Sequence, residues 1–276
     1  MRISDAVPSG TCRPWETLLG APEVGQHVAE LYTDRAFLVA TVSRYAGEAL
    51  RRGEAVLLVM TADHGAATVR RLGQAGFDVA SLVRHDQLTV LGAAHTLSQI
   101  LEGGMPDARR FDAMIGEVVA AAEAAGYPTV RAFGEMVDLL RHTSMAACLR
   151  LEALWNELIA ARGVALLCGY SLDVFDPQIY EGLVQQVAGA HSHLVPAQDY
   201  ARLDHAVECA YADVFGSKTD GRFLRRAFLG HYTRPTAMPD AHAAILAARE
   251  FVPAATTTAL LERARHHYRT GPAAAA

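Results

Sequence analysis

The chain has 276 residues, of which 51% are hydrophobic, and a formal net charge of −5 near neutral pH. This length suggests two domains, or one large domain with an extension, and the apolar content suffices for a buried core. The acidic balance argues against a dedicated nucleic-acid surface, which is normally basic.

The cysteine pattern and the hydropathy of the chain predict the cellular compartment of the protein. The four cysteines, Cys12, Cys148, Cys168 and Cys209, are scattered without a C-x-x-C pair, as is typical of free thiols in a reducing compartment. The N-terminus has no apolar stretch like that of a signal peptide, and no run of 18 apolar residues occurs. We therefore expect a cytoplasmic protein without a membrane partner and without a direct nucleic-acid partner.

The predicted elements divide the chain into four segments. Residues 1–24 are rich in proline and glycine and indicate an irregular leader, with Trp15 as its anchor on the body. Residues 25–197 alternate strand and helix patterns. Residues 198–270 show only helical patterns, at 199–214, 221–231, 240–251 and 256–269. Residues 271–276, a Gly-Pro pair followed by alanines, are expected to be disordered.

The alternating segment predicts the fold class. Residues 55–60 and 164–170 are continuous apolar runs, the pattern of strands buried on both faces of a parallel sheet. Further strands are predicted at 27–32, 88–91 and 129–133 and after His191. Helices are predicted between them, at 34–51, 61–75, 95–101, 107–126, 145–162 and 177–189. Strands separated by helices require right-handed crossovers, so we expect an α/β fold with a doubly wound, mainly parallel sheet and a C-terminal helical extension.

Ligands in such sheets bind beyond the carboxyl ends of the strands, which selects Tyr32, Thr61, residues 131–135 and residues 168–170 as rim residues. The first strand-to-helix turn is unsuited to phosphate. It has no glycine between Gly25 and Gly47, and the pattern G-x-x-x-x-G-K-[ST] is absent. Ordinary P-loop hydrolysis is therefore not expected.

Seven short blocks occur in a fixed order along the first 195 residues. They are His27–Tyr32 (His-x-x-x-Leu-Tyr), Gly53–Leu57, Leu88–Val90, Arg131–Met136 (Arg-x-x-Gly-Glu-Met), Glu152–Asn156 (Glu-x-x-x-Asn), Leu167–Tyr170 and His191. Together they resemble the MEDS domain, the sensory domain named after methanogens and the dichloromethane regulator of methylotrophs.

The resemblance implies a core similar to RecA- and KaiC-like ATPases but with a degraded phosphate loop. It also implies a sensor of small organic molecules or a signalling module, a type often joined to kinase or DNA-binding domains in transcription regulation. One position departs from the family. The first strand often carries a cysteine two residues after the histidine, and Ala29 stands there in this chain, so thiol chemistry at that position cannot apply.

The expected ligand-binding residues come from separate elements that share the rim: His27, Tyr32, Arg131, Glu135, Cys168, Tyr170 and His191. Arg131 and Glu135, four positions apart, would hold a polar ligand group or form a structural ion pair. Tyr32 would stack on a planar ligand or fill the space that phosphates would use. Cys168 and Tyr170 face the same side of their strand, and the cysteine is either a functional thiolate or a small hydrophobe.

His27, Cys168 and His191 with Glu135 would suit zinc by residue type. No pair among them is separated by two to four residues, so the spacing predicts no metal ligand and leaves the cofactor unknown. His191 and His193 are expected to form an exposed or hydrogen-bonded turn.

Three hypotheses follow from these patterns. The first is a non-catalytic sensor that binds a small organic effector at the rim and relays the signal to a partner protein. The second is a metal- or thiol-dependent enzyme using His27, Cys168, Glu135 and His191. The third is an oligomerising interaction module that does not hydrolyse nucleotide. The sequence shows no nucleophile elbow G-x-S-x-G and no other convincing catalytic constellation, which favours the first hypothesis.

Overall fold

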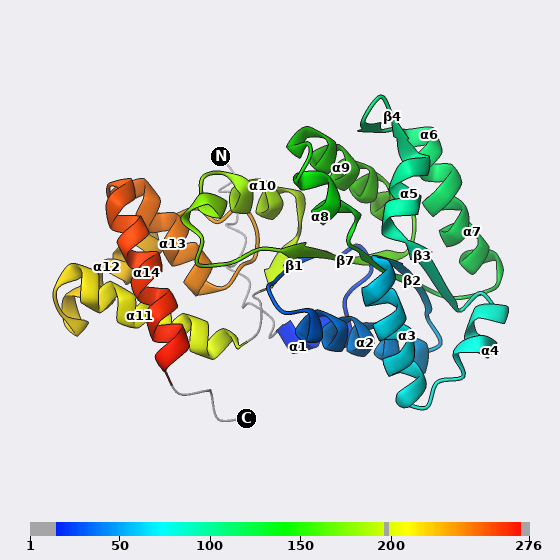
Figure 1. Cartoon of the computed structure of the whole chain (residues 1–276), viewed down its shortest axis with the longest axis horizontal. Coiled ribbons are helices and arrows are strands. Elements are labelled where there is room, and N and C mark those ends of the chain that lie inside the picture. The colour runs from blue at the N-terminus through cyan, green and yellow to red at the C-terminus, as the bar shows by residue number, and fades with distance from the viewer. Residues whose placement is uncertain (1–14, 196–198, 272–276) are drawn as a thin grey trace, which may run out of the picture.

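The computed structural model describes residues 15–195 and 199–271 (Figure 1). Six strands form one all-parallel sheet in the order β3-β2-β6-β7-β1-β8. Their bounds are β1 His27–Tyr32, β2 Ala55–Met60, β3 Leu88–Gly92, β6 Val130–Gly134, β7 Val164–Ser171 and β8 His193–Val195. The predicted α/β fold with a doubly wound parallel sheet and a C-terminal helical extension is confirmed.

Helices cover both faces of the sheet, which explains why its central strands are buried throughout. Every residue of β1, β2 and β6 is buried, whereas in the edge strand β3 only Leu88 is buried and the following residues are half-buried or exposed. One face carries α1 Trp15–Gly20, α2 Arg35–Arg51, α3 Ala62–Gln74 and α4 Val79–Arg84. The other carries α5 Ala93–Ile100, α6 Ala108–Phe111, η1 Asp112–Gly116, α7 Glu117–Ala124, α8 Met136–Arg141, α9 Met145–Ala161 and α10 Leu183–Ala190. We call these the α2 face and the α9 face.

The structure differs from the sequence prediction in local detail. Residues 15–20, expected to be irregular, form α1; the anchoring expected of the Trp15 side chain lies outside the described atoms. A two-stranded hairpin, β4 Leu101–Glu102 and β5 Met105–Pro106, follows α5, because Gly103 and Gly104 adopt positive φ. The helix predicted at 177–189 is split into η2 Pro177–Tyr180 and α10, since Gly182 has φ 130° between them.

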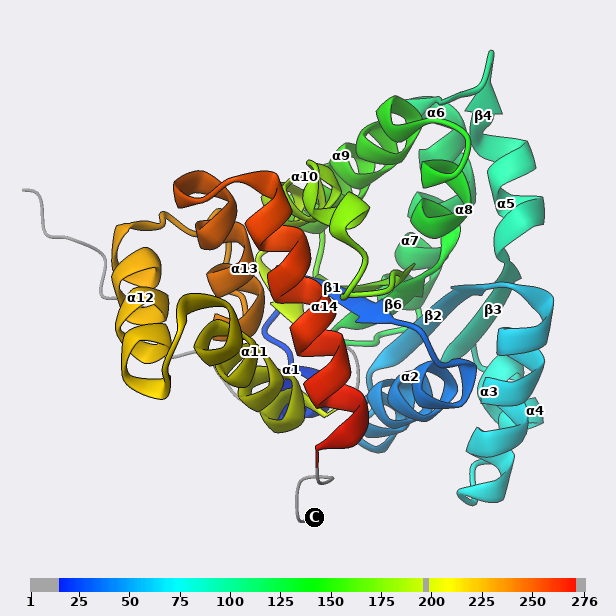
Figure 2. The same ribbon diagram turned by 60° about the vertical axis from the view of Figure 1, so that its left-hand side comes forward.

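Four C-terminal helices pack against the end of the sheet layer (Figure 2). They are α11 Tyr200–Phe215, α12 Lys218–His231, α13 Asp240–Phe251 and α14 Ala254–Thr270. Buried residues of α11, α13 and α14 belong to the same hydrophobic cluster as the α9 face of the sheet. The tail also adds one backbone bridge to the sheet, where the Leu194 N–H donates to the Ala237 carbonyl at 2.8 Å. The helical region is therefore continuous with the core.

Within the described ranges, no helix is both long and apolar enough to cross a bilayer.

The α11–α12 contact depends on a glycine, which gives a first prediction. A Cβ at Gly221 would lie 2.6 Å from the backbone nitrogen of Ala212, so Gly221→Ala must push the two helices apart. We expect a loss of about 1–3 kcal/mol in the free energy of unfolding, measured by urea denaturation. Gly230→Ala in the same helix is the matched control: its Cβ meets nothing within 4 Å, and the better helix propensity of alanine should add up to about 1 kcal/mol. Equal effects of the two substitutions would contradict the steric argument.

Candidate functional site

The side-chain carboxylate of Asp34 occupies the N-terminus of the helix that follows β1. Asp34 caps α2, and its Oδ1 accepts the Phe37 N–H at 2.7 Å. In nucleotide-binding sheets the amides at this helix N-terminus bind phosphate. Here an acidic side chain takes that place and would repel a second anion, in agreement with the missing glycines in the sequence.

A polar pair lies at the carboxyl rim of the sheet, between β2 and β6. His64 of α3 contacts Glu135, with 2.8 Å between Nδ1 and Oε1. The other carboxylate oxygen of Glu135 accepts the Thr61 N–H at 3.2 Å. Glu135 follows β6 directly and is buried, while the His64 side chain is 16% exposed. The rim therefore offers a partly accessible imidazole oriented by a buried carboxylate; we call His64 and Glu135 the rim pair.

Tyr32 lies beside the rim pair, at the carboxyl end of β1. Its ring meets that of His64 edge-on, with 6.3 Å between the ring centroids. Tyr32 is 6% exposed and packs in the core of the α2 face. Burial, followed by the charge of Glu135, raises the pKa of the phenol well above its ordinary range, so it remains a neutral hydroxyl. Tyr32 thus supplies an aromatic edge to the rim.

The sequence prediction that Arg131 and Glu135 form a pair at the rim is wrong. Arg131 is the second residue of β6 and Glu135 follows its last residue, and four residues of extended chain span about 13 Å. Arg131 is buried at the opposite end of the strand. There its guanidinium forms a bidentate ion pair with Glu54 and donates a hydrogen bond to the carbonyl of Gly20. It therefore fixes α1 to the sheet and does not reach the rim.

A second polar group is buried on the α9 face, below the rim. It comprises His27 at the start of β1, Glu152 on α9, Cys168 on β7 and His191 directly after α10. One ligand-type atom from each of these residues lies within 4.8 Å of all the others, and all four residues are buried. We call them the buried tetrad. His27, Cys168 and His191 were predicted to belong to one site, and the structure brings them together.

Glu152 is the centre of the buried tetrad. Its Oε2 lies 3.2 Å from the Nε2 of His27, and its Oε1 lies 3.3 Å from the Nε2 of His191. The Cys168 thiol lies 3.8 Å from Oε2 and 3.3 Å from the His27 Nε2. Tyr170 donates its hydroxyl to Oε1. Glu152 thus takes the place that the sequence hypothesis gave to Glu135.

The hydrogen bonds around the buried tetrad fix both imidazole tautomers. The Asn156 amide NH₂ donates to the Ala190 carbonyl at 3.0 Å, so its oxygen faces the His27 Nδ1 at 2.9 Å. The His191 Nδ1 lies 2.6 Å from the Val187 carbonyl. Since both Nδ1 atoms face acceptors, both carry the proton. The two Nε2 atoms therefore point into the tetrad, and the His191 Nε2 has no hydrogen-bond partner among the described residues.

Burial determines the charge states of His191 and Cys168 in the tetrad. It lowers the pKa of His191 to about 4 despite the nearby Glu152 carboxylate, so that ring is neutral near pH 7. Burial, then the Glu152 charge, raises the pKa of the Cys168 thiol well above its ordinary range. The thiol is consequently not a nucleophile by itself. His191 is buried and hydrogen-bonded, which excludes the exposed turn considered for it from the sequence.

The residues that the sequence predicted to line one pocket therefore form two groups on opposite faces of the sheet. Alternate residues of a strand point to opposite sides, so Tyr32 faces α2 whereas Cys168 and Tyr170 face α9. Sequence reasoning missed Glu152, Asn156 and His64 as site residues. Glu152 and Asn156 are four apart on one helix face, and this Glu-x-x-x-Asn spacing was the available signal. No local spacing linked His64 to Glu135.

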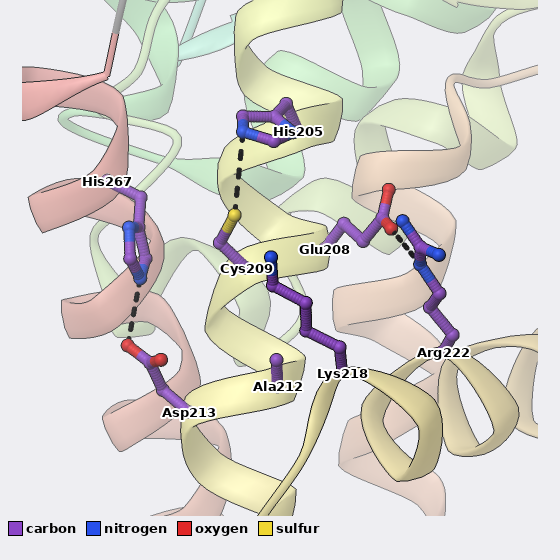
Figure 3. Close-up of a pocket in the computed structure, with 8 residues that line it drawn as sticks. All are labelled: His205, Glu208, Cys209, Ala212, Asp213, Lys218, Arg222 and His267. Carbon is purple, nitrogen blue, oxygen red and sulfur yellow. Dashed lines mark hydrogen bonds and ion pairs between the residues drawn. The ribbon is translucent and has the colours of Figure 1, made fainter.

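The tail contains a separate polar cleft of about 170 Å³ (Figure 3). Its charges are largely paired: His267 with Asp213 at 2.8 Å, and Arg222 with Glu208. Cys209 lies 3.5 Å from the His205 Nε2. Burial, followed by the Glu208 charge, raises the pKa of Cys209, so its thiol stays protonated near neutral pH. The cleft does not have the activated thiolate of a thiol enzyme.

Comparison with known proteins agrees with the blocks in the sequence. Residues 26–192 match the family model of the MEDS domain, described as the methanogen/methylotroph, DcmR sensory domain. The match covers more than half of the chain and contains the rim pair and the buried tetrad. No curated protein matches the sequence. The chain therefore belongs to the MEDS family, whose domain is a sensory domain.

Proposed function

We propose that the protein is a non-catalytic sensor that holds a small organic effector at the rim pair. The observation that carries this proposal is the contact of His64 with the buried Glu135 at 2.8 Å beside the Tyr32 ring. The imidazole offers one polar contact of fixed orientation, and the tyrosine edge offers an apolar wall. That combination suits a compact, weakly polar molecule better than a phosphate-bearing one, which Asp34 would repel.

Hydrogen bonds offer a route from the rim to the tail. Asp138 of α8, three residues after Glu135, accepts the Ser171 N–H at 2.9 Å. Ser171 ends β7 and begins the loop in which Asp173 pairs with Arg265 of α14 at 2.6 Å. An effector that draws Glu135 and α8 toward it would move this loop against α14. For the signal to reach a partner protein, the two arrangements of the tail must differ in effector affinity.

Native mass spectrometry of the purified full chain tests the rim as a binding site. We expect a retained small molecule, or binding of one probe from a panel of methanol, dichloromethane, acetate and methylamine. His64→Ala should weaken that binding about tenfold, the effect of losing one hydrogen bond with a charged or polarised partner. His85→Ala is the matched control, because the His85 side chain is exposed and lies against the carbonyl and hydroxyl of the neighbouring Ser81, away from the rim pair.

Hydrogen exchange with the same bound compound tests the relay. Protection should change in α14 and in residues 171–176. Binding that is equally strong in His64→Ala would place the effector elsewhere, and saturation without any change in α14 would remove the relay.

A further inference from the structure

Beyond effector binding at the rim, we propose that the buried tetrad of His27, Glu152, Cys168 and His191 is a structural binding site for a divalent transition-metal ion of the zinc class. The argument rests on donor type, donor spacing, the orientation of the lone pairs and the elements that the four residues connect.

The donor set is one thiol sulfur, two imidazole nitrogens and one carboxylate oxygen. Sulfur and nitrogen donors in a four-membered set favour zinc over magnesium or calcium, which prefer six or more oxygens. All four donors are protein side chains and are buried. A site closed in this way has no open position for water or substrate, as is typical of structural zinc.

Several of the donor spacings match the edges of a tetrahedron around zinc. Ligands at bond lengths of about 2.0–2.3 Å in tetrahedral geometry lie about 3.3–3.8 Å from one another. The His27 Nε2 lies 3.2 Å from the Glu152 Oε2 and 3.3 Å from the Cys168 sulfur, which is 3.8 Å from the same oxygen. The His191 Nε2 lies 3.3 Å from the other oxygen, Oε1, and one donor atom from each residue lies within 4.8 Å of all the others. A bound ion would draw the most widely spaced donors, up to 4.8 Å apart, toward the common centre.

The two Nε2 atoms already point to the common centre. Both imidazoles carry the proton on Nδ1, held by Asn156 and by the Val187 carbonyl, which is the tautomer and the outer support that metal-binding histidines use. The His191 Nε2 is completely buried and lacks a hydrogen-bond partner among the described residues. This nitrogen faces a carboxylate oxygen of Glu152 at 3.3 Å without a hydrogen bond, and two acceptor atoms this close repel unless a cation or a proton lies between them. A bound ion resolves this conflict, and its binding releases the Cys168 thiol proton to solvent as the metal–sulfur bond forms.

The ion would join four elements at the junction with the tail. His27 begins β1, Cys168 is on β7, Glu152 is on α9, and His191 follows α10. The His191 carbonyl accepts the hydroxyl of Thr236, from the loop between α12 and α13, at 2.7 Å. Metal binding would therefore fix the sheet, two helices and the attachment of the tail together.

Elemental analysis of the purified full chain tests the proposal. We expect about one zinc per chain in the wild type, and less than about one tenth of that in Cys168→Ser, which removes a direct ligand. Cys148→Ser is the matched control: Cys148 is also buried and close to Tyr170 but is not a tetrad member, so its metal content should equal that of the wild type. Equal metal content in all three proteins would overturn the assignment.

Cobalt titration of the chelator-treated wild-type chain gives a readout that does not depend on a variant that folds. Co²⁺ should give the visible bands of a tetrahedral site and a near-ultraviolet band from cobalt–thiolate bonding, and Cys148→Ser should give the same spectrum. Circular dichroism confirms the fold of each sample. A folded wild type that binds neither Co²⁺ nor Zn²⁺ at about 100 µM, or that shows no thiolate band, would overturn the proposal.

Discussion

Replacing Glu152 with alanine is expected to lower the free energy of unfolding by about 3–5 kcal/mol, even in excess chelator. The carboxylate is 1% exposed and contacts both imidazoles of the buried tetrad. It also accepts the hydroxyl of the fully buried Tyr170. Removing it leaves these groups without their partner in a dry environment and opens a cavity beside α9, and both effects are costly.

The measurement is urea denaturation of the full chain with chelator present, so that metal binding does not contribute. Glu157→Ala on the same helix provides the control. Glu157 pairs with Arg150 at 3.2 Å, and its side chain is 62% exposed, so we expect a loss below about 1 kcal/mol. Similar losses for the two variants would show that the tetrad does not act as a buried network.

The second large effect concerns pH and Glu30, in the middle of β1. Burial raises the pKa of this carboxyl from 4.5 to about 8, although a hydrogen bond from Thr41 acts in the opposite direction. Between these two pH values the folded protein binds a proton that the unfolded chain has lost. The stability from this group is therefore complete below pH 4.5 and is lost as pH rises toward 8, by roughly 3–4 kcal/mol between pH 5 and pH 8.

Glu30→Gln removes the titration while keeping the shape of the side chain. We expect the difference in unfolding free energy between variant and wild type to move in favour of the variant by roughly 3 kcal/mol as pH rises from 5 to 8. Urea denaturation at several pH values measures this difference, and the other titrating groups cancel in it. Glu157→Gln, at the exposed helix position, should give a curve parallel to that of the wild type. A parallel curve for Glu30→Gln would mean that Glu30 is ionised in the folded protein.

The strands could be predicted because a strand buried on both faces is encoded by a continuous run of apolar residues. Residues 55–60 and 164–170 are apolar throughout since helices cover both faces of the sheet, and the alternation with helices fixed the parallel arrangement. Short elements such as α4 and the β4–β5 hairpin have too few residues for a periodic signal.

The sites were harder to predict because their partners are distant in sequence. Arg131 and Glu135 are close in number but lie at opposite ends of a strand, whereas Glu135 and His64 meet across the rim. Glu152 reaches His27 from another element entirely. Metal spacing rules such as C-x₂₋₄-C describe ligands from one loop, so they carry no information about four donors from four elements.

The hydrogen bond from Leu194 to Ala237 links the sheet to the tail, so the two regions depend on each other. β8 is a terminal strand of the sheet, and a terminal strand with free backbone groups is a template for pairing with other chains. The tail covers this strand with its own backbone and with the packed helices α11, α13 and α14. By covering β8, the helical region prevents this edge from pairing with other chains. A change that released the tail completely would expose an aggregation-prone strand edge. For a relay of the proposed kind, we therefore expect small shifts of the tail that keep the edge covered.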